Sequence, residues 1–340
     1  MIRRYPGYLL QFVAVVALLL GAAMTASRLQ AGPSLQDVPR LDGVRIYFSE
    51  DNKEASPFDR SGDGLSRWGG LLASLGAKIE VLDWRRDIPA DADLVVIAGP
   101  TKDLDDYQSA RLWSYLKEGG ALLVLAEPLV TSTADDGSTL VEAHKALQAE
   151  RGLFILTWAD YGLRARDDVV VMPSGEGNLA LDVIASGARA NHPVTAGLTG
   201  DLAFFGARSV GFDASVQTFT ATPLIFGGGM LYGETAYVAY VEIGEAAYTA
   251  NQDTAPESLA LAVAAEDSAS GSRVLIIGDR DFATNAGGLR TSPPNTAAFV
   301  YPANVEFLLR AVAWLAGADE TATVPLSFPT PAPTPAAGTE

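Results

Sequence analysis

Acidic side chains follow several of the apolar runs in this sequence, and carboxylates gathered in one place can bind a cation or a polyol, or act as an acid–base pair. In open parallel sheets, ligands bind outside the carboxyl ends of the strands. We therefore predict that the residues which follow these runs share one rim of a sheet and make any ligand contact there. The candidate ligand contacts are Glu50, Asp51, Glu127, Asp279, Asp281 and Asn285.

Carboxylates that lie this close together need a compensating cation or polar ligand. Lys102, Arg280 and Arg60 are the nearby cations in the sequence. The plainer interpretation is that these acidic residues cap turns and helices, which Asp and Asn commonly do at such junctions. Both interpretations remain open at the level of the sequence.

Other motifs offer little chemistry. The segment from Asp59 to Gly64 has the spacing of a calcium loop, but the twelfth position, where an EF-hand requires Glu, is Gly70. His192 precedes a proline and fits a turn residue better than a general base. With no cysteine and only two histidines, the chain cannot form a thiolate nucleophile, a disulfide or a multi-histidine metal site. We predict no catalytic residue, no metal and no cofactor.

The elements that must position the rim residues follow from the apolar pattern. Strands are predicted at 44–48, 78–82, 94–98, 121–125, 259–265 and 273–277, and helices at 65–75, 103–117, 140–151 and 304–316. Strands and helices that alternate with short turns predict an α/β fold with a doubly wound, mostly parallel sheet flanked by helices, as in flavodoxin-like folds. Residues from about 163 to 258 read as an irregular β-rich insertion.

The N-terminus carries a long uncharged segment, Tyr5 to Ser27, of 23 residues. It is long enough to cross a bilayer, and Arg3 and Arg4 favour a cytoplasmic N-terminus with the remaining chain outside. A cleaved secretory signal is the alternative. We predict one transmembrane anchor at 1–28, a linker at 29–43, an extracytoplasmic domain at 44–318 and a disordered Pro/Thr-rich tail at 319–340. The net charge of −17 argues against nucleic acid as a partner.

Several phrases resemble one family when they are taken in order. They are Asp93–Pro100, Leu116–Leu125, Asn191–Thr195 and Arg273–Asn285, followed by the predicted closing helix. Together they resemble the GldG-like auxiliary components of gliding-motility-type ABC transporters and the related DUF4350 domains. The resemblance implies a glutamine-amidotransferase-like α/β sandwich on a membrane anchor, beside the permease and ATPase subunits of an ABC transporter. The amidotransferase relatives use a cysteine nucleophile, which this chain lacks, so the resemblance implies no catalytic mechanism.

The leading hypothesis is therefore a membrane-anchored, extracytoplasmic and non-catalytic accessory or binding component of an ABC-type transport system. One alternative is a hydrolase of carbohydrate or envelope material that uses a pair of the rim carboxylates. Such a pair should face one cleft, about 5–9.5 Å apart, whereas carboxylates that each cap their own turn would argue against hydrolysis. A purely structural surface protein is the third hypothesis.

Overall fold

The computed structural model describes residues 35–324 apart from residues 103, 128, 134–138, 144–160, 176–177, 187–188, 214, 217, 238–247 and 319–320. The predicted membrane anchor at 1–28 lies outside the described residues. The same holds for the start of the predicted linker, for the chain beyond residue 324 and for the part of the predicted helix that follows residue 143.

A seven-stranded sheet forms the centre of the domain, in the spatial order β14-β16-β17-β5-β4-β2-β3. The five strands from β17 to β3 run parallel to one another, and β16 and β14 continue the sheet antiparallel. The prediction of an α/β fold with a mostly parallel sheet is therefore confirmed. The strands are β2 (Arg45–Phe48), β3 (Lys78–Val81), β4 (Leu94–Ala98), β5 (Ala121–Leu125), β14 (Thr220–Phe226), β16 (Ala260–Glu266) and β17 (Arg273–Ile277).

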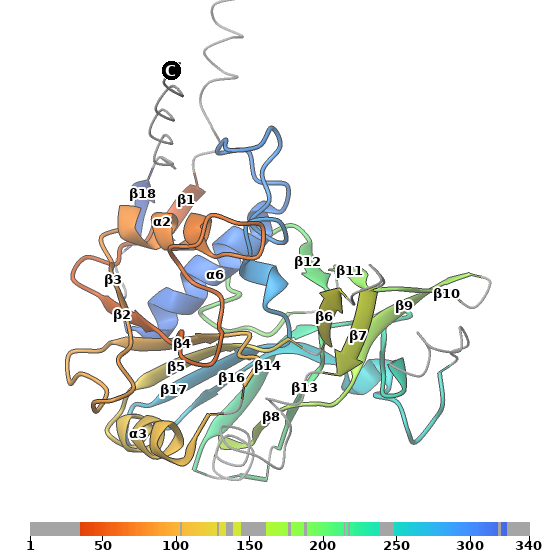
Figure 1. Cartoon of the computed structure of the whole chain (residues 1–340), viewed down its shortest axis with the longest axis horizontal. Helices are drawn as coiled ribbons and strands as arrows, with labels where there is room; N and C mark the ends of the chain where they lie inside the picture. Colours follow the sequence, from red (N-terminus) through yellow and green to blue (C-terminus); the bar gives the residue numbers. More distant parts are fainter. Residues whose placement is uncertain are drawn as a thin grey trace, which may run out of the picture.

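Helices cover both faces of this sheet. Figure 1 shows α2 (Ser66–Ser74) and α6 (Pro302–Leu315) above it and α3 (Asp106–Lys117) below it. Every residue of β4 and of β5 is buried because each strand packs against helices on both sides. The α2 side is anchored by Trp68, whose ring meets Phe48 edge-on at 5.5 Å. The apolar strands β4 and β5 therefore form the buried centre of the sheet, and the rim residues follow the ends of its strands.

Short antiparallel strands make up the insertion between β7 and β16. They are β8 (Leu163–Ala165), β9 (Val169–Gly175), β10 (Asn178–Ala180), β11 (Asp182–Ala185), β12 (Leu202–Phe205), β13 (Val210–Phe212) and β15 (Tyr232–Glu234), with the 3₁₀ turns η1 (Pro256–Ser258) and η2 (Asp281–Ala283) on either side of the last sheet hairpin. They pair in groups of two or three strands. The insertion bears on the rim because its loop between β12 and β13 contacts the end of β17, where the Arg208 amide donates to the Gly278 carbonyl.

The predicted helix at 140–151 is wrong over residues 140–143. Residues Thr139–Ala143 form strand β7, which pairs antiparallel with β6 (Leu129–Thr133) from Leu129 opposite Ala143 to Thr133 opposite Thr139. The segment Leu-Val-Thr-Ser-Thr of β6 is rich in β-branched residues, and cross-strand pairing with it outweighs the weak helical spacing.

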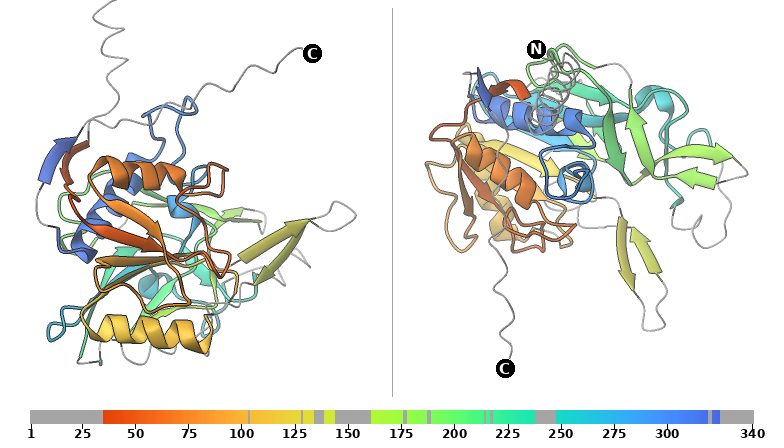
Figure 2. Two further views of the ribbon diagram at one scale, coloured as in Figure 1. Left: turned by 60° about the vertical axis from the view of Figure 1, so that its left-hand side comes forward. Right: turned by 90° about the horizontal axis from the view of Figure 1, so that it is seen from above.

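Two further strands lie in the segments predicted as linker and tail. Strand β1 (Leu35–Pro39) pairs antiparallel with β18 (Thr321–Val324), so that Leu35 lies opposite Val324. The two ends of the described chain therefore leave the domain side by side. Figure 2 shows this β1–β18 ribbon and the β6–β7 hairpin on opposite sides of the body.

Within residues 35–324, and only in the parts that the structure describes, no helix combines the length and the apolar character needed to cross a bilayer.

Candidate functional site

Two of the predicted rim residues, Glu127 and Asp279, lie next to each other because their strands are neighbours in register. Leu125 of β5 lies opposite Ile277 of β17, and the Ala126 amide donates to the Ile277 carbonyl at 2.8 Å. Glu127 and Asp279 each follow this pair by two residues. The sheet thus brings two carboxyl groups from positions 152 residues apart to one point of the rim.

The side chain of Asp279 is completely buried, and its carboxylate binds a backbone amide. One carboxylate oxygen accepts the Phe205 amide at 2.7 Å, which ties the end of β12 to the end of β17. Burial and then the charge of Asp281 raise the pKa of Asp279 well above its ordinary value, and the amides of Phe205, Phe282 and Asp281 act in the opposite direction. Asp279 therefore joins β12 to the end of β17, although its other oxygen finds no hydrogen-bond partner among the described residues.

Glu127 is 8% exposed, and one of its carboxylate oxygens lacks a hydrogen-bond partner in the described part of the chain. Burial, followed by the charges of Asp279 and Asp281, raises the pKa of Glu127 well above its ordinary value. The positive charge of Arg280 acts in the opposite direction. The guanidinium of Arg280 binds Asp281 at 2.7 Å and lies half-buried. The stem of Arg280 crosses the end of β4 at Gly99, where a Cβ atom would overlap it and where the backbone has φ +63°.

A buried arginine that the sequence did not single out completes this cluster. Arg208, only 2% exposed, donates to the Arg166 carbonyl at 2.7 Å and to Asp167 at 3.1 Å. Its charge also interacts with Glu127. It lies in the loop between β12 and β13, and no local pattern of the insertion distinguishes it from a surface arginine. Only the placement of that loop on the β17 end reveals it.

Glu50 and Asp51 do not join the cluster. They follow β2, which is separated from β5 by β4, and two strand spacings amount to about 10 Å. Asp51 is exposed and its charge acts on Glu54 and Arg85. Glu50 is half-buried, with one carboxylate oxygen that has no hydrogen-bond partner among the described residues.

Asn285 supports the loop that resembles a calcium site. Its side-chain amide donates to the carbonyls of Asp59 and Ser61 at 3.1 and 2.7 Å, and its oxygen accepts the Arg67 amide at 2.9 Å. These bonds use the backbone oxygens that a cation would need and hold the loop at the start of α2. No group of three or more acidic or histidine side chains suited to a metal ion occurs in the described part of the chain.

His192 behaves as a turn residue. Its Nδ1 accepts the Val194 amide at 3.3 Å, and its ring packs edge-on against Trp314 at 4.7 Å. Burial lowers the pKa of His192. These contacts match the turn interpretation and give the ring no rim carboxylate as a partner among the described residues.

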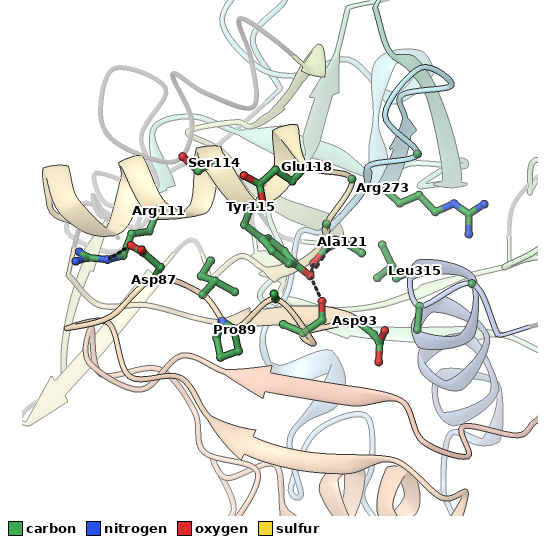
Figure 3. A pocket seen from close by; sticks show the side chains of 18 of the residues that line it. Asp87, Pro89, Asp93, Arg111, Ser114, Tyr115, Glu118, Ala121, Arg273 and Leu315 are labelled. Atoms are coloured by element: carbon green, nitrogen blue, oxygen red, sulfur yellow. Dashed lines mark hydrogen bonds and ion pairs between the residues drawn. The ribbon is translucent and has the colours of Figure 1, made fainter.

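A large open cavity of about 900 Å³ lies at the opposite edge of the sheet, at the amino ends of β4, β5 and β17. Figure 3 shows Tyr115 reaching from α3 across this cavity toward Ala121. The Tyr115 hydroxyl contacts the carbonyls of Ala92 and Ala121, so it pins α3 to the strand ends. At the outer wall, Arg111 pairs with the exposed Asp87 at 3.3 Å. No predicted site residue lines this cavity.

The neutral variant Glu127→Gln is expected to raise stability at neutral pH. A carboxyl whose pKa is raised in the folded state stabilises the fold below its unfolded pKa, about 4, and that contribution is lost as pH rises through the folded value. Removing the buried charge should therefore increase the free energy of unfolding at pH 7–8 by roughly 1–3 kcal/mol. The native protein should lose stability as pH rises above about 4, and the variant should lose less, as measured by thermal unfolding at a series of pH values.

The exposed Glu118→Gln is the matched control, because it removes the same charge from the surface. If the stability of the native protein and of Glu127→Gln changed with pH in the same way, the buried carboxyl of Glu127 would not have a raised pKa.

Comparisons with solved structures find matches over most of this chain. The mmIFT52 N-terminal domain is similar over 81% of this chain and 99% of its own length, with 15% identity and a TM-score of 0.53. Cytoplasmic protein STM3548 from Salmonella typhimurium matches over 80% and 98%, with 12% identity and a TM-score of 0.46. A ThuA-like protein from Bacteroides uniformis matches over 81% and 91%, with 8% identity and a TM-score of 0.44.

No curated protein matches the sequence. The sequence model of a family described as ABC-type uncharacterized transport system, an auxiliary family of such transporters, matches residues 69–311. That range holds more than two thirds of the chain and includes β4, β5, β17 and the rim cluster. The chain therefore belongs to this family of ABC-type transport system auxiliary proteins.

Proposed function

We propose that this chain is a membrane-anchored, extracytoplasmic accessory component of an ABC-type transport system, and that it binds a partner or ligand without catalysing a reaction. The family match over residues 69–311 carries the association with transport. The uncharged segment from Tyr5 to Ser27 supports the anchor and the export of the domain. The finer relationship that we propose is to GldG-like and DUF4350 proteins, on a glutamine-amidotransferase-like fold.

The contacts of the rim carboxylates support binding over hydrolysis. A glycosidase needs two carboxyl groups that face the substrate from opposite sides. Asp279 is completely buried and holds the Phe205 amide, and Asp281 is paired with Arg280. Withdrawing Asp279 would release the end of β12, and withdrawing Asp281 would separate it from Arg280. We therefore propose that the cluster of Glu127, Asp279 and Arg208 sets the shape of this edge. Within the cluster Glu127 has a carboxylate oxygen left for a ligand, and outside it Glu50 and Asp51 offer further carboxylates.

Membrane attachment and orientation are tested by fractionating cells that express the full chain with a C-terminal tag. The protein should remain with the membranes after carbonate extraction and be released only by detergent. Protease added to intact spheroplasts should remove the tag. Tagged protein in the cytosol, or a tag protected until the cells are lysed, would contradict the proposed topology.

Association with a transporter is tested by affinity purification from detergent-solubilised membranes. We expect a permease and an ATPase subunit to copurify with the full chain. The matched control replaces residues 1–28 with a cleaved secretory signal, which exports the same domain without an anchor. Loss of the transporter subunits from the control alone would assign their capture to the anchor, and their absence from both preparations would contradict the proposal.

A further inference from the structure

A second cavity lies on the α3 face of the sheet, away from the rim, and we propose that it binds a small aromatic carboxylate. This aromatic pocket has a volume of about 360 Å³ and is formed by the last turn of α3, the start of β14 and the turn between β16 and β17. Its principal lining residues are Trp113, Lys117, Tyr161, Thr218, Phe219 and Asp267. Ligand pockets are typically 300–1,000 Å³ and mainly apolar, with a few polar groups that orient the ligand.

Aromatic rings from three separate segments form the wall of the pocket. The Tyr161 ring lies 3.8 Å from that of Phe219 and 6.2 Å, edge-on, from that of Trp113. Tyr161 and Phe219 are buried, and Trp113 is half-buried at the edge. Such a wall favours a flat ring, because aromatic pairs are stabilised in tilted and edge-to-face arrangements. The slot is therefore suited to a ring of benzene size.

Two hydrogen-bond donors, on Lys117 and Thr218, lie at the mouth of the pocket. The ammonium group of Lys117 lies 4.5 Å from the centre of the Trp113 ring. Lys117 is exposed and has no ion pair with any residue that the structure describes, and the exposed Thr218 hydroxyl has no hydrogen bond with one. An ammonium and a hydroxyl beside an apolar slot match a carboxylate attached to a ring.

Asp267, the one acidic side chain that lines the pocket, already forms hydrogen bonds within its own turn. Asp267 is 8% exposed, and its carboxylate accepts the Ala269 amide at 2.8 Å and the Ser270 hydroxyl at 2.5 Å. These bonds hold the turn between β16 and β17 and leave Asp267 facing its own backbone. Lys117 is therefore the charge that a ligand meets first, which favours an anion over a cation.

The test uses the full chain in phosphatidylcholine nanodiscs at pH 7 and 150 mM salt, with empty nanodiscs as the blank. Saturation-transfer NMR compares benzoate, benzamide and benzylamine, which share a ring and differ in charge. Benzoate should bind about ten-fold more tightly than benzylamine, with benzamide in between, because a hydrogen bond to a charged group adds about that factor.

Variants then locate the site. Lys117→Gln should weaken benzoate about ten-fold and leave benzamide nearly unchanged. Lys78→Gln removes the same charge from edge strand β3 and should leave both ligands unaffected. Val216→Phe, which fills part of the pocket, should weaken all three probes. Tighter binding of benzylamine than benzoate, or benzoate binding that neither Lys117→Gln nor Val216→Phe alters, would overturn the proposal. Either result leaves the proposed transport role untouched.

Discussion

The variant Gly278→Ala should lose more than about 4 kcal/mol of unfolding free energy, or fail to accumulate as folded protein. A Cβ atom at Gly278 would overlap the carbonyl oxygen of Arg208. Neither backbone can move aside, because the Arg208 amide donates to the Gly278 carbonyl at 2.6 Å and the Gly278 amide donates to Leu261 at 2.9 Å. The measurement is urea-induced unfolding, followed by tryptophan fluorescence.

Gly62→Ala is the matched control for this prediction. A Cβ atom there would meet only the Cβ of the exposed Ala286, at 3.1 Å, so the loss should stay below about 1 kcal/mol. If Gly278→Ala unfolded at the same urea concentration as the native protein, the loop between β12 and β13 would not lie on the end of β17. Arg208 would then not lie beside Glu127 and Asp279.

The second large effect is expected for Asn285→Asp, which should destabilise the fold by about 3–5 kcal/mol at pH 7. The substitution keeps the shape of the side chain but removes the donors to the Asp59 and Ser61 carbonyls. It also places a negative charge beside those oxygens at a site only 5% exposed. Protonation restores one donor, so part of the loss should be recovered as pH falls toward 4. Thermal unfolding at several pH values measures both effects.

Asn191→Asp makes the same chemical change at an exposed position and should alter stability by less than about 0.5 kcal/mol. Asn285→Ala should be less harmful than Asn285→Asp, because it removes the donors without adding a charge. Equal stability of native protein and Asn285→Asp would show that Asn285 does not support the loop, and would return it to the predicted role of a ligand contact.

Much of the central sheet is readable from local sequence. The runs Leu94–Ala98 and Ala121–Leu125 are apolar at every position, and a strand buried on both faces requires that pattern. The hairpin of β16 and β17 follows from two apolar runs joined by the turn that Asp267 holds. Helix α3 is preceded by the N-cap residue Asp105, whose capping box with Gln108 is a local signal.

Two strand pairings were not readable in this way. Strand β7 was predicted as helix, because its partner β6 determines its conformation and the five-residue segment carries no decisive spacing of its own. The β1–β18 ribbon joins residues near 35 to residues near 324, in segments that composition alone marks as linker and tail. In both cases the deciding hydrogen bonds come from another part of the chain.

The predicted site residues at the rim also divide into those that the sequence placed correctly and those whose position depends on the tertiary structure. Because parallel strands place their carboxyl ends on one edge, the order of strands and acidic residues was enough to predict that Glu127 and Asp279 would share it. The distance of Glu50 and Asp51 from that pair depends on β4 lying between β2 and β5, which is a matter of strand order in space.

The sequence by itself determined the α/β class, the acidic and cysteine-free character of the chain and the strands that end at the rim, because these depend on composition and on local apolar periodicity. Only the tertiary structure decided that the side chains of Asn285 and Asp279 form hydrogen bonds with the backbone of distant segments. It also decided that Arg208 is buried beside Glu127 and that an aromatic pocket forms on the α3 face. The physical reason is that burial and hydrogen-bond partners are set by segments far apart along the chain, which local patterns do not encode.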